Sequence, residues 1–435
     1  MKSFYHLLLA WLGSVIYRHP SKKIILIGIT GTKGKSSTIE ILNAILEAAG
    51  KKTALLSSIR VKVGEVSEKN RTDTTMPGRF FIQKFLRRAV QNGCTHAIVE
   101  VTSQGVLQSR HLFLDFAVAA FLNLHPEHVE AHGSFEAYRE AKLKFFRQVA
   151  KTGSAKKKIF VVNSSDPSAE LFIKAAGGSG SIARSNKADF ISRTLKGDTE
   201  FLGEWFQNDF NLEDAALAST IAEALGIGNG SIIRALGYFT GIPGRMEWVQ
   251  KNPFGVLVDY AHTPDSLRVV YKTLRDQMAR RLQSSNNKET PDSLIPNPKP
   301  LTLDANRLPS KLICVLGSAG GGRDAWKRPE FGRIAAEFCD EIILTDEDPY
   351  NEDPEKIMDE IESGISLNPQ PLTLNFILKR SVNRRTAIET GIKDAAEGDV
   401  VVITGKGSEE WIHQSHGKKI PWSDVQVAKD TLKKP

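Results

Sequence analysis

The sequence has few cysteines, and its apolar N-terminal stretch is too short to cross a membrane. Only Cys94, Cys314 and Cys339 occur in 435 residues; they are far apart and predict neither a disulfide framework nor a metal knuckle. The stretch Phe4–Tyr17 falls short of the roughly 20 residues that a spanning helix needs, and no convincing signal-peptide pattern surrounds it. These absences predict a protein of the reducing cytoplasm. Phe4–Tyr17 is expected to form a helix that packs on the core or, as the weaker alternative, makes weak contact with a membrane surface.

The sequence also lacks any basic motif interleaved with aromatic residues. Its formal net charge is +8, but the lysines and arginines are scattered, so anionic small-molecule partners are expected and nucleic acid is not. Hydrophobic residues make up 41% and charged residues 25% of the chain, as in soluble globular proteins. The length predicts two or three domains.

The most informative stretch is Gly28–Ser37, which reads GITGTKGKSS. It follows the apolar, β-branched run 23–27 and precedes a segment, 38–47, with apolar residues at helical spacing. This pattern predicts a strand, a glycine turn and a helix, which is the context of a phosphate-binding loop.

The residue types of this turn suit a nucleoside triphosphate. Gly31 and Gly34 let backbone N–H groups surround an anion, Lys35 can reach the terminal phosphates, and the Ser36 hydroxyl can ligate Mg²⁺. The pattern G-x-x-x-x-G-K-[ST] fails only at Ile29, where glycine is usual. A glycine turn without a ligand is the weaker alternative, because Lys35 and Ser36 stand together at the helix start.

Two alternations of strands and helices predict an α/β fold. Expected strands of the first lie at 53–56, 97–101, 117–121 and 158–163, with helices at 79–91, 134–150, 212–225 and 231–239. Residues 166–206 are polar and predict short strands or loops. Expected strands of the second lie at 256–259, 312–316, 341–345 and 399–404.

The predicted domains are an N-terminal apolar helix (1–22), a central P-loop ATPase domain with a mostly parallel sheet (23–242) and a smaller Rossmann-like C-terminal domain (243–435). Residues 280–310 are rich in Ser, Asn and Pro and predict a flexible insertion in the C-terminal domain.

Three further residues fall where catalytic groups of such sheets gather. Glu100 ends a predicted strand, where a carboxylate can hold Mg²⁺ opposite Ser36. His128 follows another strand end, and Lys142 lies fourteen residues later on a predicted helix. Each alone is more often a capping or solvated residue, so the residues by themselves leave both interpretations open.

Taken together, the motifs resemble the Mur ligase family, ATP-dependent peptide synthetases that build the cell-wall stem peptide. The motifs are TGTKGKS, EVTSQGV, FLNLHPEH, EAK, GRME, DYAHTPD, GRDAWKRP, DEDP and GKG, in this order over roughly residues 24–425. Folylpolyglutamate and cyanophycin synthetases are relatives. Within the family the chain is most similar to UDP-N-acetylmuramoyl-tripeptide synthetases, which add the third amino acid.

The resemblance implies roles for individual residues. The implied catalytic residues are Lys35, Glu100, His128, Lys142 and Arg245. The implied nucleotide-binding residues are Gly31, Thr32, Gly34, Lys35, Ser36, Ser37, Asn211, Arg245, Asp259 and His262. Among these, Arg245 would meet the terminal phosphate, Asp259 the ribose and Asn211 the adenine. Asp214 stands where a second adenine-contacting Asn is usual.

Metal and substrate residues are implied in the same way. Ser36 and Glu100 would hold one Mg²⁺ and His128 a second, supported by a carbamylated Lys142. The implied acceptor residues are Thr74, Thr75, Ser103 and Arg110, and those for the incoming amino acid are Arg323, Asp348, Tyr350, Gly405 and Glu409. Closure of the second domain over the first would assemble the site.

Two departures from the family pattern bear on the substrates. Only a short segment precedes the first predicted strand, so the family's N-terminal UDP-binding domain is expected to be missing, and the acceptor's UDP is held elsewhere or absent. Where enzymes for meso-diaminopimelate read D-N-P-R, this chain reads Glu347-Asp348-Pro349-Tyr350. Loss of the arginine and gain of Asp348 favour a cationic distal end, as in lysine or ornithine, over diaminopimelate. Glu409 could hold an ammonium as well.

The sequence therefore predicts a monomeric, ATP- and Mg²⁺-dependent amide ligase. It would activate the carboxylate of UDP-MurNAc-L-Ala-D-Glu as an acyl phosphate and add a lysine-like amino acid or diaminopimelate, releasing ADP and phosphate. Alternatives are a folylpolyglutamate- or cyanophycin-type ligase, a ligase for a lipid-linked precursor, a nucleotide-binding protein with degraded catalysis, and a P-loop phosphotransferase. The last of these would not need the DYAHTPD region.

Overall fold

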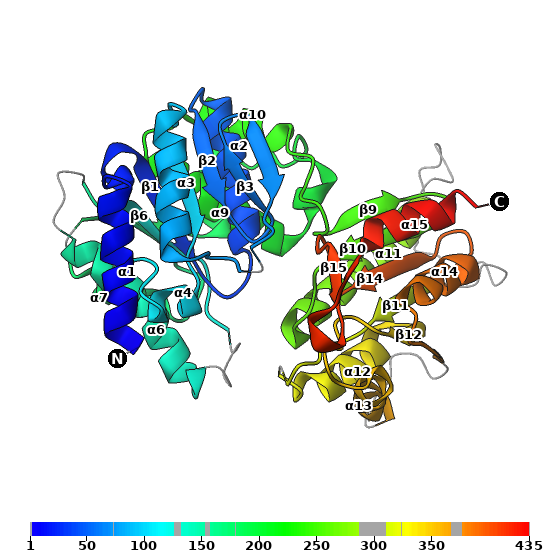
Figure 1. Ribbon diagram of the computed structural model, residues 1–435. Coiled ribbons are helices and arrows are strands. Elements are labelled where there is room, and N and C mark those ends of the chain that lie inside the picture. The colour runs from blue at the N-terminus through cyan, green and yellow to red at the C-terminus, as the bar shows by residue number, and fades with distance from the viewer. Residues whose placement is uncertain are drawn as a thin grey trace, which may run out of the picture. The chain divides into compact units, whose positions relative to one another are not determined.

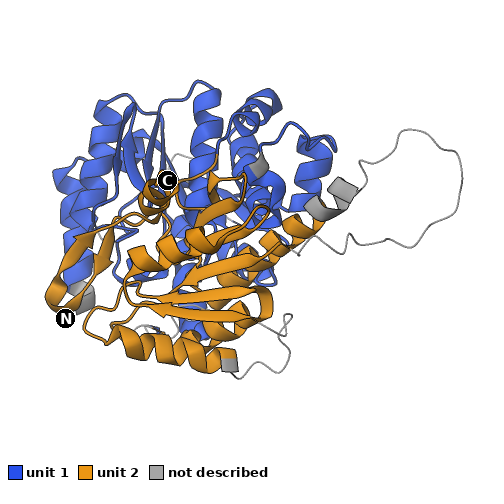
Figure 2. Cartoon of the chain, turned by 90° about the vertical axis from the view of Figure 1, so that its right-hand side faces the viewer, with its two compact units in different colours: residues 1–240 blue, residues 241–435 orange. Residues whose placement is uncertain are grey.

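The chain consists of two compact units, residues 1–240 and 241–435 (Figures 1 and 2). The computed structural model describes residues 2–72, 74–125, 132–152, 157–178, 180–286, 310–322, 324–366 and 376–434. In that part of the chain, no helix combines the length and the hydropathy needed to cross a membrane.

The first unit is built on an eight-stranded sheet in the order β4-β3-β2-β5-β1-β6-β7-β8. Six strands pair in parallel: β1 (Ile25–Thr30), β2 (Thr53–Leu56), β5 (His96–Glu100), β6 (Phe116–Phe121), β7 (Ile159–Asn163) and β8 (Ser181–Ser185). The antiparallel strands β3 (Arg60–Val63) and β4 (Val66–Lys69) complete one edge. Because β1 lies between β5 and β6, the glycine turn leaves the middle of the sheet at its carboxyl edge, where ligands of open α/β sheets bind.

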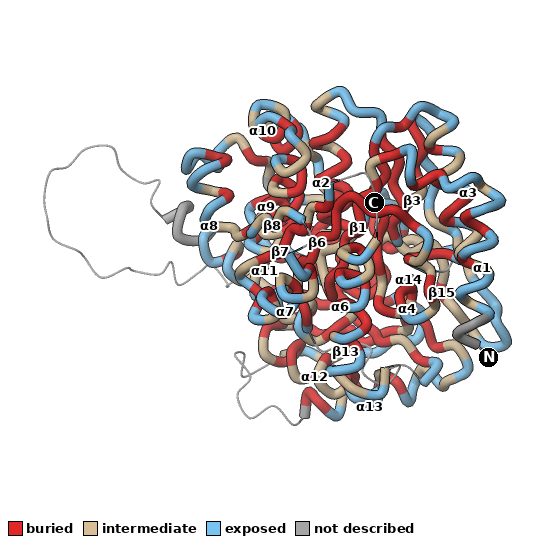
Figure 3. The backbone as a smooth tube through the Cα atoms, turned by 90° about the vertical axis from the view of Figure 1, so that its left-hand side faces the viewer, coloured by how far each residue is buried: buried red, intermediate tan, exposed pale blue. Residues whose placement is uncertain are grey.

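Helices cover this sheet, whose central strands are buried (Figure 3). They are α1 (Lys2–Ile16), α2 (Lys35–Ala48), α3 (Arg79–Gln91), α4 (Ser103–Leu107), α6 (Phe135–Lys151), α7 (Ala169–Ala176), α8 (Lys187–Asp189), α9 (Asp209–Ala224) and α10 (Asn229–Gly237), with short turns η1 (Pro20–Lys23), η2 (Phe190–Thr194) and η3 (Glu204–Gln207). Helix α2 packs on α9 and α10, α6 packs on α4 and α7, and α1 lies along α3 (Figure 1).

Gly28 in β1 is explained by packing. A Cβ there would lie 2.6 Å from Cζ of Phe145 and 2.8 Å from Cε1 of Phe116, distances that side chains do not tolerate. The missing side chain lets α6 approach β1 closely. Lys142 lies one turn before Phe145 on α6, so this close approach also brings Lys142 toward the glycine turn.

The second unit has a six-stranded sheet in the order β13-β12-β11-β14-β10-β9. Its strands are β9 (Glu247–Gln250), β10 (Gly255–Asp259), β11 (Leu312–Leu316), β12 (Glu341–Thr345), β13 (Ile377–Ser381) and β14 (Val400–Thr404), and only β9 pairs antiparallel. Its helices are α11 (Pro264–Asn286), α12 (Lys327–Phe338), α13 (Pro354–Ser366), α14 (Arg384–Asp394) and α15 (Asp424–Leu432); η4 (Ser415–Gly417) lies between β15 (Trp411–His413) and β16 (Lys419–Pro421). The α/β class with a large, mostly parallel sheet and a second sheet domain is thus confirmed.

Two expectations about local structure were wrong. Residues 166–206 contain the helix α7, whose buried Phe172 packs on the core, in addition to the short strand β8. Helix α11 continues to Asn286, so residues 280–286 are helical; the rest of the expected insertion, 287–309, lies outside the described residues.

The expectation that the cysteines would not pair was also wrong. Cys314 in β11 and Cys339 at the end of α12 form a disulfide, with 6.1 Å between their Cα atoms. The helix α12 returns the chain to β12, the neighbour of β11, so residues distant in sequence become adjacent. Cys94 is free and buried. The cysteine pattern therefore no longer argues for a reducing compartment.

Candidate active site

The glycine turn has the backbone geometry of an anion-binding loop. Gly34 has φ +76°, a conformation that glycine adopts without strain, and a Cβ there would lie 2.1 Å from Oδ1 of Asp214. Helix α2 begins at Lys35 with no side-chain cap. The first amides of this helix therefore point their N–H groups and the positive end of the helix dipole toward the turn.

Asn123 holds the turn in place. Its Oδ1 accepts hydrogen bonds from the backbone N–H groups of Thr32 (3.0 Å) and Lys33 (2.9 Å), and its Nδ2 donates to the carbonyl of Lys33 (3.2 Å). Our sequence interpretation did not assign Asn123 a role, although it lies in the motif FLNLHPEH. The sequence signal that could have identified Asn123 was its position just after β6, the strand next to β1.

The carboxyl edge of the sheet brings Lys35, Ser36 and Glu100 together. The Ser36 hydroxyl donates to Oε2 of Glu100 at 3.0 Å, and Nζ of Lys35 lies 3.8 Å from Oε1 of the same carboxylate. Nζ of Lys35 also donates to the carbonyl of Thr32 at 2.8 Å. The Ser58 hydroxyl, which the sequence did not single out, lies 2.8 Å from that of Ser36. A hydroxyl and a buried carboxylate beside a lysine fit a phosphate-bound Mg²⁺, which prefers oxygen ligands.

Lys142 reaches the same loop from α6. Its side chain is buried, Nζ donates to the carbonyl of Gly31 at 2.6 Å, and the ammonium lies 4.6 Å from the centre of the Tyr138 ring. The Tyr138 hydroxyl lies 3.1 Å from Oγ1 of Thr32. His128 lies outside the described residues. Within the described ranges, no group of three or more His, Cys, Asp or Glu side chains could hold a metal ion.

The two α9 residues expected near adenine are buried. Nδ2 of Asn211 donates to the carbonyl of Trp205 at 2.6 Å, and Oδ1 of Asp214 accepts from the Thr38 hydroxyl at 3.4 Å. Asp214 therefore lies against the glycine turn and α2. An adenine contact by Asn211 stays a prediction.

The residues expected at the acceptor surround the loop 74–76. The guanidinium of Arg110 donates to the carbonyl of Met76 and, at 2.7 Å, to Gln108. Burial and the neighbouring Arg79 lower the pKa of Arg110. Thr74 is exposed and its carbonyl accepts from Asn70; Thr75 directly precedes Met76. The Ser103 hydroxyl lies 3.1 Å from Nε2 of His132. Arg79, unassigned in our sequence interpretation, adds a second guanidinium to this loop cluster and suits an anionic acceptor.

In the second unit, Asp259 ends β10 and organises the preceding turn. Its Oδ2 accepts from the Met246 N–H (2.8 Å) and its Oδ1 from the Ala261 N–H (2.7 Å). Burial raises the pKa of Asp259, which the nearby Arg245 opposes. The Arg245 guanidinium lies 4.1 Å from the centre of the Tyr260 ring. Asp259 thus orients the segment that carries Arg245.

His262 and Glu409 both contact Tyr260. Nδ1 of His262 lies 2.9 Å from the Tyr260 carbonyl, and the Tyr260 hydroxyl donates to Oε1 of Glu409 at 3.0 Å. These residues come from the end of β10 and the loop after β14, two neighbouring strands of the sheet.

The buried ammonium of Lys406 links the residues expected at the amino acid. It donates to Oδ1 of Asp348 at 2.8 Å and to Oε2 of Glu409 at 2.6 Å. Burial raises the pKa of Glu409, but Lys406 and Tyr260 together hold it below the ordinary value. Both carboxylates thus share one ammonium, whereas the sequence interpretation treated Asp348 and Glu409 only as anions for a cationic substrate.

Other residues of this expected site frame the Lys406 cluster. Gly405 has φ +110°, and a Cβ there would lie 2.5 Å from Oε2 of Glu347. The Tyr350 ring stacks on His413 with 5.2 Å between the ring centres, and the His413 N–H donates to Asp348. Arg323 lies outside the described residues.

Replacing Glu347 with glutamine is expected to stabilise the protein at alkaline pH. Burial raises the pKa of Glu347 from the ordinary 4.5 to about 7, although Lys406 and Arg384 oppose the rise. Between these values the folded state keeps a proton that the unfolded state has lost, so the free energy of unfolding falls as pH rises. Glutamine mimics the protonated acid. At pH 8 we expect Glu347→Gln to raise the free energy of unfolding by about 2–3 kcal/mol.

Chemical denaturation on both sides of this pH window measures the effect. Below pH 4.5, which is the ordinary pKa of a glutamate carboxyl, the variant and the parent should have nearly equal free energies of unfolding. The exposed Glu397 provides the control, since Glu397→Gln should not change the pH dependence. A Glu347→Gln variant less stable than the parent at pH 8 would show that the ionised carboxylate is needed.

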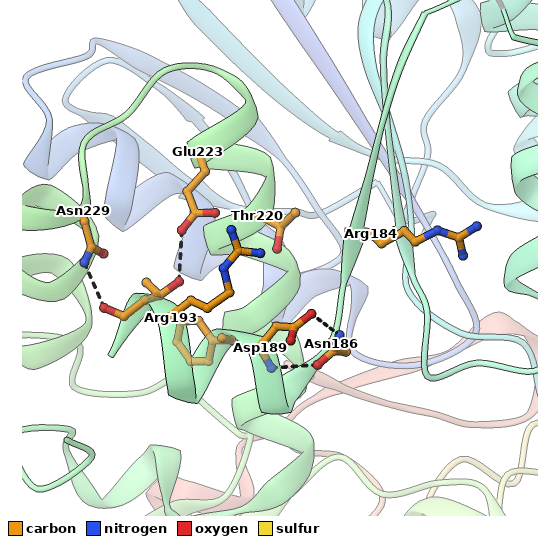
Figure 4. A pocket seen from close by; sticks show the side chains of 9 residues that line it. Arg184, Asn186, Asp189, Arg193, Thr220, Glu223 and Asn229 are labelled. Atoms are coloured by element: carbon orange, nitrogen blue, oxygen red, sulfur yellow. Dashed lines mark hydrogen bonds between the residues drawn. The ribbon is translucent and has the colours of Figure 1, made fainter. Parts of the chain in front are cut away.

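A separate cavity of about 320 Å³ lies between β8, α8, η2 and the end of α9 (Figure 4). Its lining includes Arg184, Arg193 and Glu223, and Glu223 accepts from the Thr194 hydroxyl at 3.0 Å. None of the sequence-predicted site residues lines it.

The sheet topology, the uncapped glycine turn and the cluster of Lys35, Ser36 and Glu100 define an α/β enzyme that binds a nucleoside triphosphate. Residues 29–203 match the Mur ligase middle domain, and residues 244–284 and 301–407 match the Mur ligase glutamate ligase domain. The chain belongs to the Mur ligase family and is an ATP-dependent ligase that uses Mg²⁺.

Individual relatives cover nearly the whole chain. It is 33% identical to the UDP-N-acetylmuramoyl-L-alanyl-D-glutamate–2,6-diaminopimelate ligase of Synechocystis sp., a match that covers 97% of this chain and 78% of that protein. It is 32% identical to the UDP-N-acetylmuramyl-tripeptide synthetase of Roseiflexus sp., over 98% and 81% of the two chains. A solved UDP-N-acetylmuramoyl-L-alanyl-D-glutamate–2,6-diaminopimelate ligase shares 26% identity and superposes with a TM-score of 0.56, covering 94% of this chain and 78% of that one.

Proposed function

We propose that this ligase joins an amino acid to the terminal carboxylate of UDP-MurNAc-L-Ala-D-Glu in peptidoglycan precursor synthesis. The relatives named for this reaction support the proposal. The observation that carries the ATP-dependent step is the Lys35, Ser36 and Glu100 cluster at an uncapped helix start. The reaction transfers the terminal phosphate of ATP to the acceptor carboxylate, and the amine then displaces phosphate from the acyl phosphate.

The chain's own residues can meet the demands of this chemistry. Lys35 and the first amides of α2 bind the phosphates and stabilise the charge that develops on the transferring group. Arg79 and Arg110 supply positive charge for an anionic acceptor, and Arg245 supplies it for the terminal phosphate. Mg²⁺, held by Ser36 and Glu100, would neutralise phosphate charge.

We further propose a second Mg²⁺ site in which His128 is a ligand and Lys142 is carbamylated. The support is the position of Lys142, buried against the carbonyl of Gly31 in the phosphate loop. An ammonium there repels a metal ion, whereas a carbamate turns the same side chain into an anion that can support one.

For the incoming amino acid we propose meso-diaminopimelate, not lysine. The sequence argument for lysine has two parts: the loss of the arginine of D-N-P-R, where this chain has Tyr350, and the presence of Asp348 and Glu409 as anions for a distal ammonium. Asp348 and Glu409 already share the ammonium of the buried Lys406, which weakens the second part of that argument and leaves the first part unchanged. The relatives named for 2,6-diaminopimelate support this choice.

Phosphate release in a crossed substrate assay tests the function. UDP-MurNAc-dipeptide, and the same acceptor without UDP, are each combined with diaminopimelate, lysine or ornithine. We expect ATP turnover that depends on the UDP-linked acceptor and on diaminopimelate, with the tripeptide detected by mass spectrometry. Faster turnover with lysine would overturn the amino-acid proposal, and turnover with neither acceptor would overturn the cell-wall assignment. Stimulation by a folate or cyanophycin acceptor would establish the alternative ligase classes.

A further inference from the structure

Helix α1 exposes its apolar side and buries a small-residue side. Ala10, Gly13 and Ser14 are buried, and a Cβ on Gly13 would lie 3.6–3.7 Å from Gln83 and Phe80 of α3. Tyr5, Leu7, Leu8, Trp11, Leu12, Val15 and Ile16 are exposed, with fractions from 38% to 59%. A helix that packs on a globular unit normally shows the opposite arrangement, with its polar side in water. Every exposed position of α1 from Tyr5 onward is therefore a large apolar residue.

The charges carried by α1, the segment 17–23 and α3 have one sign. No aspartate or glutamate occurs before Glu40, and none occurs between Asp73 and Glu100, the stretch that includes α3. Arg18, Lys22 and Lys23 are exposed just after α1, and Lys84 and Arg88 are exposed on the neighbouring α3. Phe81, also exposed on α3, lies three positions before Lys84 and thus on the same side of that helix. We call these exposed residues of α1, the segment 17–23 and α3 the α1 surface.

We propose that the α1 surface docks on the interface of an anionic lipid bilayer, with α1 lying in the plane of the membrane. Apolar and aromatic side chains flanked by lysine and arginine, without carboxylates, match the acyl boundary and anionic headgroups of such a surface. Helix α1 has 15 residues and spans about 22 Å, less than the hydrocarbon thickness, so it suits the interface and not a transmembrane orientation.

Charge complementarity favours lipid over a second copy of the chain. A symmetric contact between two α1 surfaces would bring identical cations together with no carboxylate from these segments to pair with them. Anionic headgroups supply the missing negative charge. The proposal does not depend on the identity of the ligase substrates.

Vesicle cosedimentation of the full 435-residue chain tests the proposal. We expect binding to phosphatidylcholine vesicles that contain roughly 30% phosphatidylglycerol, weaker binding to pure phosphatidylcholine, and a clear loss between about 50 mM and about 500 mM NaCl. Leu8→Glu combined with Trp11→Glu should lower the partition coefficient at least about tenfold. Lys22→Gln combined with Lys23→Gln should lower it about tenfold on anionic vesicles only.

A matched control separates this surface from a general effect of added charge. Leu171 and Tyr238 are exposed apolar residues outside the α1 surface, so Leu171→Glu with Tyr238→Glu should bind vesicles as the parent does. Circular dichroism and ATP turnover of all variants should match the parent, because every substitution lies at an exposed position away from the phosphate loop. The proposal is overturned if the parent does not bind anionic vesicles at low salt, or if Leu8→Glu/Trp11→Glu binds them equally well. The proposal would also be overturned if the parent forms a dimer without lipid in sedimentation velocity and Leu8→Glu/Trp11→Glu dissociates that dimer. The α1 surface would then bind a second copy of the chain.

Discussion

Replacing Lys35 with methionine is expected to lower kcat/KM for ATP by about 10³-fold, since one preorganised cation at a transferring phosphoryl group contributes on this scale. Methionine keeps most of the length and apolar volume of the side chain but removes the ammonium, which lies 3.8 Å from Glu100 and donates to Thr32 in the same turn. Steady-state phosphate release at varied ATP measures the effect.

Lys33 provides the control because it lies in the same turn. Its backbone N–H is held by Asn123, and that contact does not depend on its side chain. Lys33→Met removes a partly buried ammonium from the same turn but leaves this backbone contact, so kcat/KM should stay within about fivefold of the parent. Equal losses in the two variants would indicate a general charge effect and would contradict the specific role of Lys35.

Replacing Lys142 with alanine is expected to lower kcat by about 10³-fold, with a smaller effect on the KM for ATP, because a carbamate at this position would support a metal that neutralises charge in the transition state. Acetate should restore part of the activity by placing a carboxylate in the vacated volume beside Gly31. When ¹³C-labelled bicarbonate is added, the NMR spectrum of the parent should show a carbamate signal. The spectrum of Lys142→Ala should not show it.

Lys144 serves as the matched control on the same helix. It is exposed, so Lys144→Ala should leave kcat, the carbamate signal and the acetate response unchanged. If Lys142 only holds the Gly31 carbonyl, Lys142→Ala should lower stability without a carbamate signal in the parent and without rescue. That result would remove the second metal site from the proposal.

The parts of the fold that depend on local sequence were predictable. Strands such as Thr53–Leu56 and Leu312–Leu316 are short β-branched or aliphatic runs between turn residues, and their period and length separate them from helices. The cluster of Lys35, Ser36 and Glu100 was predictable because Lys35 and Ser36 follow one strand, β1, and Glu100 ends its parallel neighbour, β5. Both strands end at the same edge of the sheet. Helix α7 was missed because its apolar face is short and lies within a polar stretch.

Features that depend on tertiary partners could not be read from the sequence. The pairing of Asp348 with Lys406 joins the ends of β12 and β14, which are separated by 58 positions and by the strand β11 in the sheet. The sequence gives no sign of this ion pair, and a contact of Asp348 with the incoming amino acid stays a prediction. The packing of Phe145 against Gly28 and the disulfide between Cys314 and Cys339 depend in the same way on which elements become neighbours.

The shared ammonium of Lys406 constrains which substitutions the surrounding residues tolerate. Removing Asp348 alone would leave the fully buried ammonium of Lys406 paired with Glu409 at 2.6 Å, and removing Lys406 alone would leave two desolvated acids side by side. A single substitution of Asp348 or of Lys406 is thus expected to lower the free energy of unfolding more than the double substitution of both residues. The residues of this ion-pair cluster should change by paired replacements, and the order in which these arise should be restricted by epistasis.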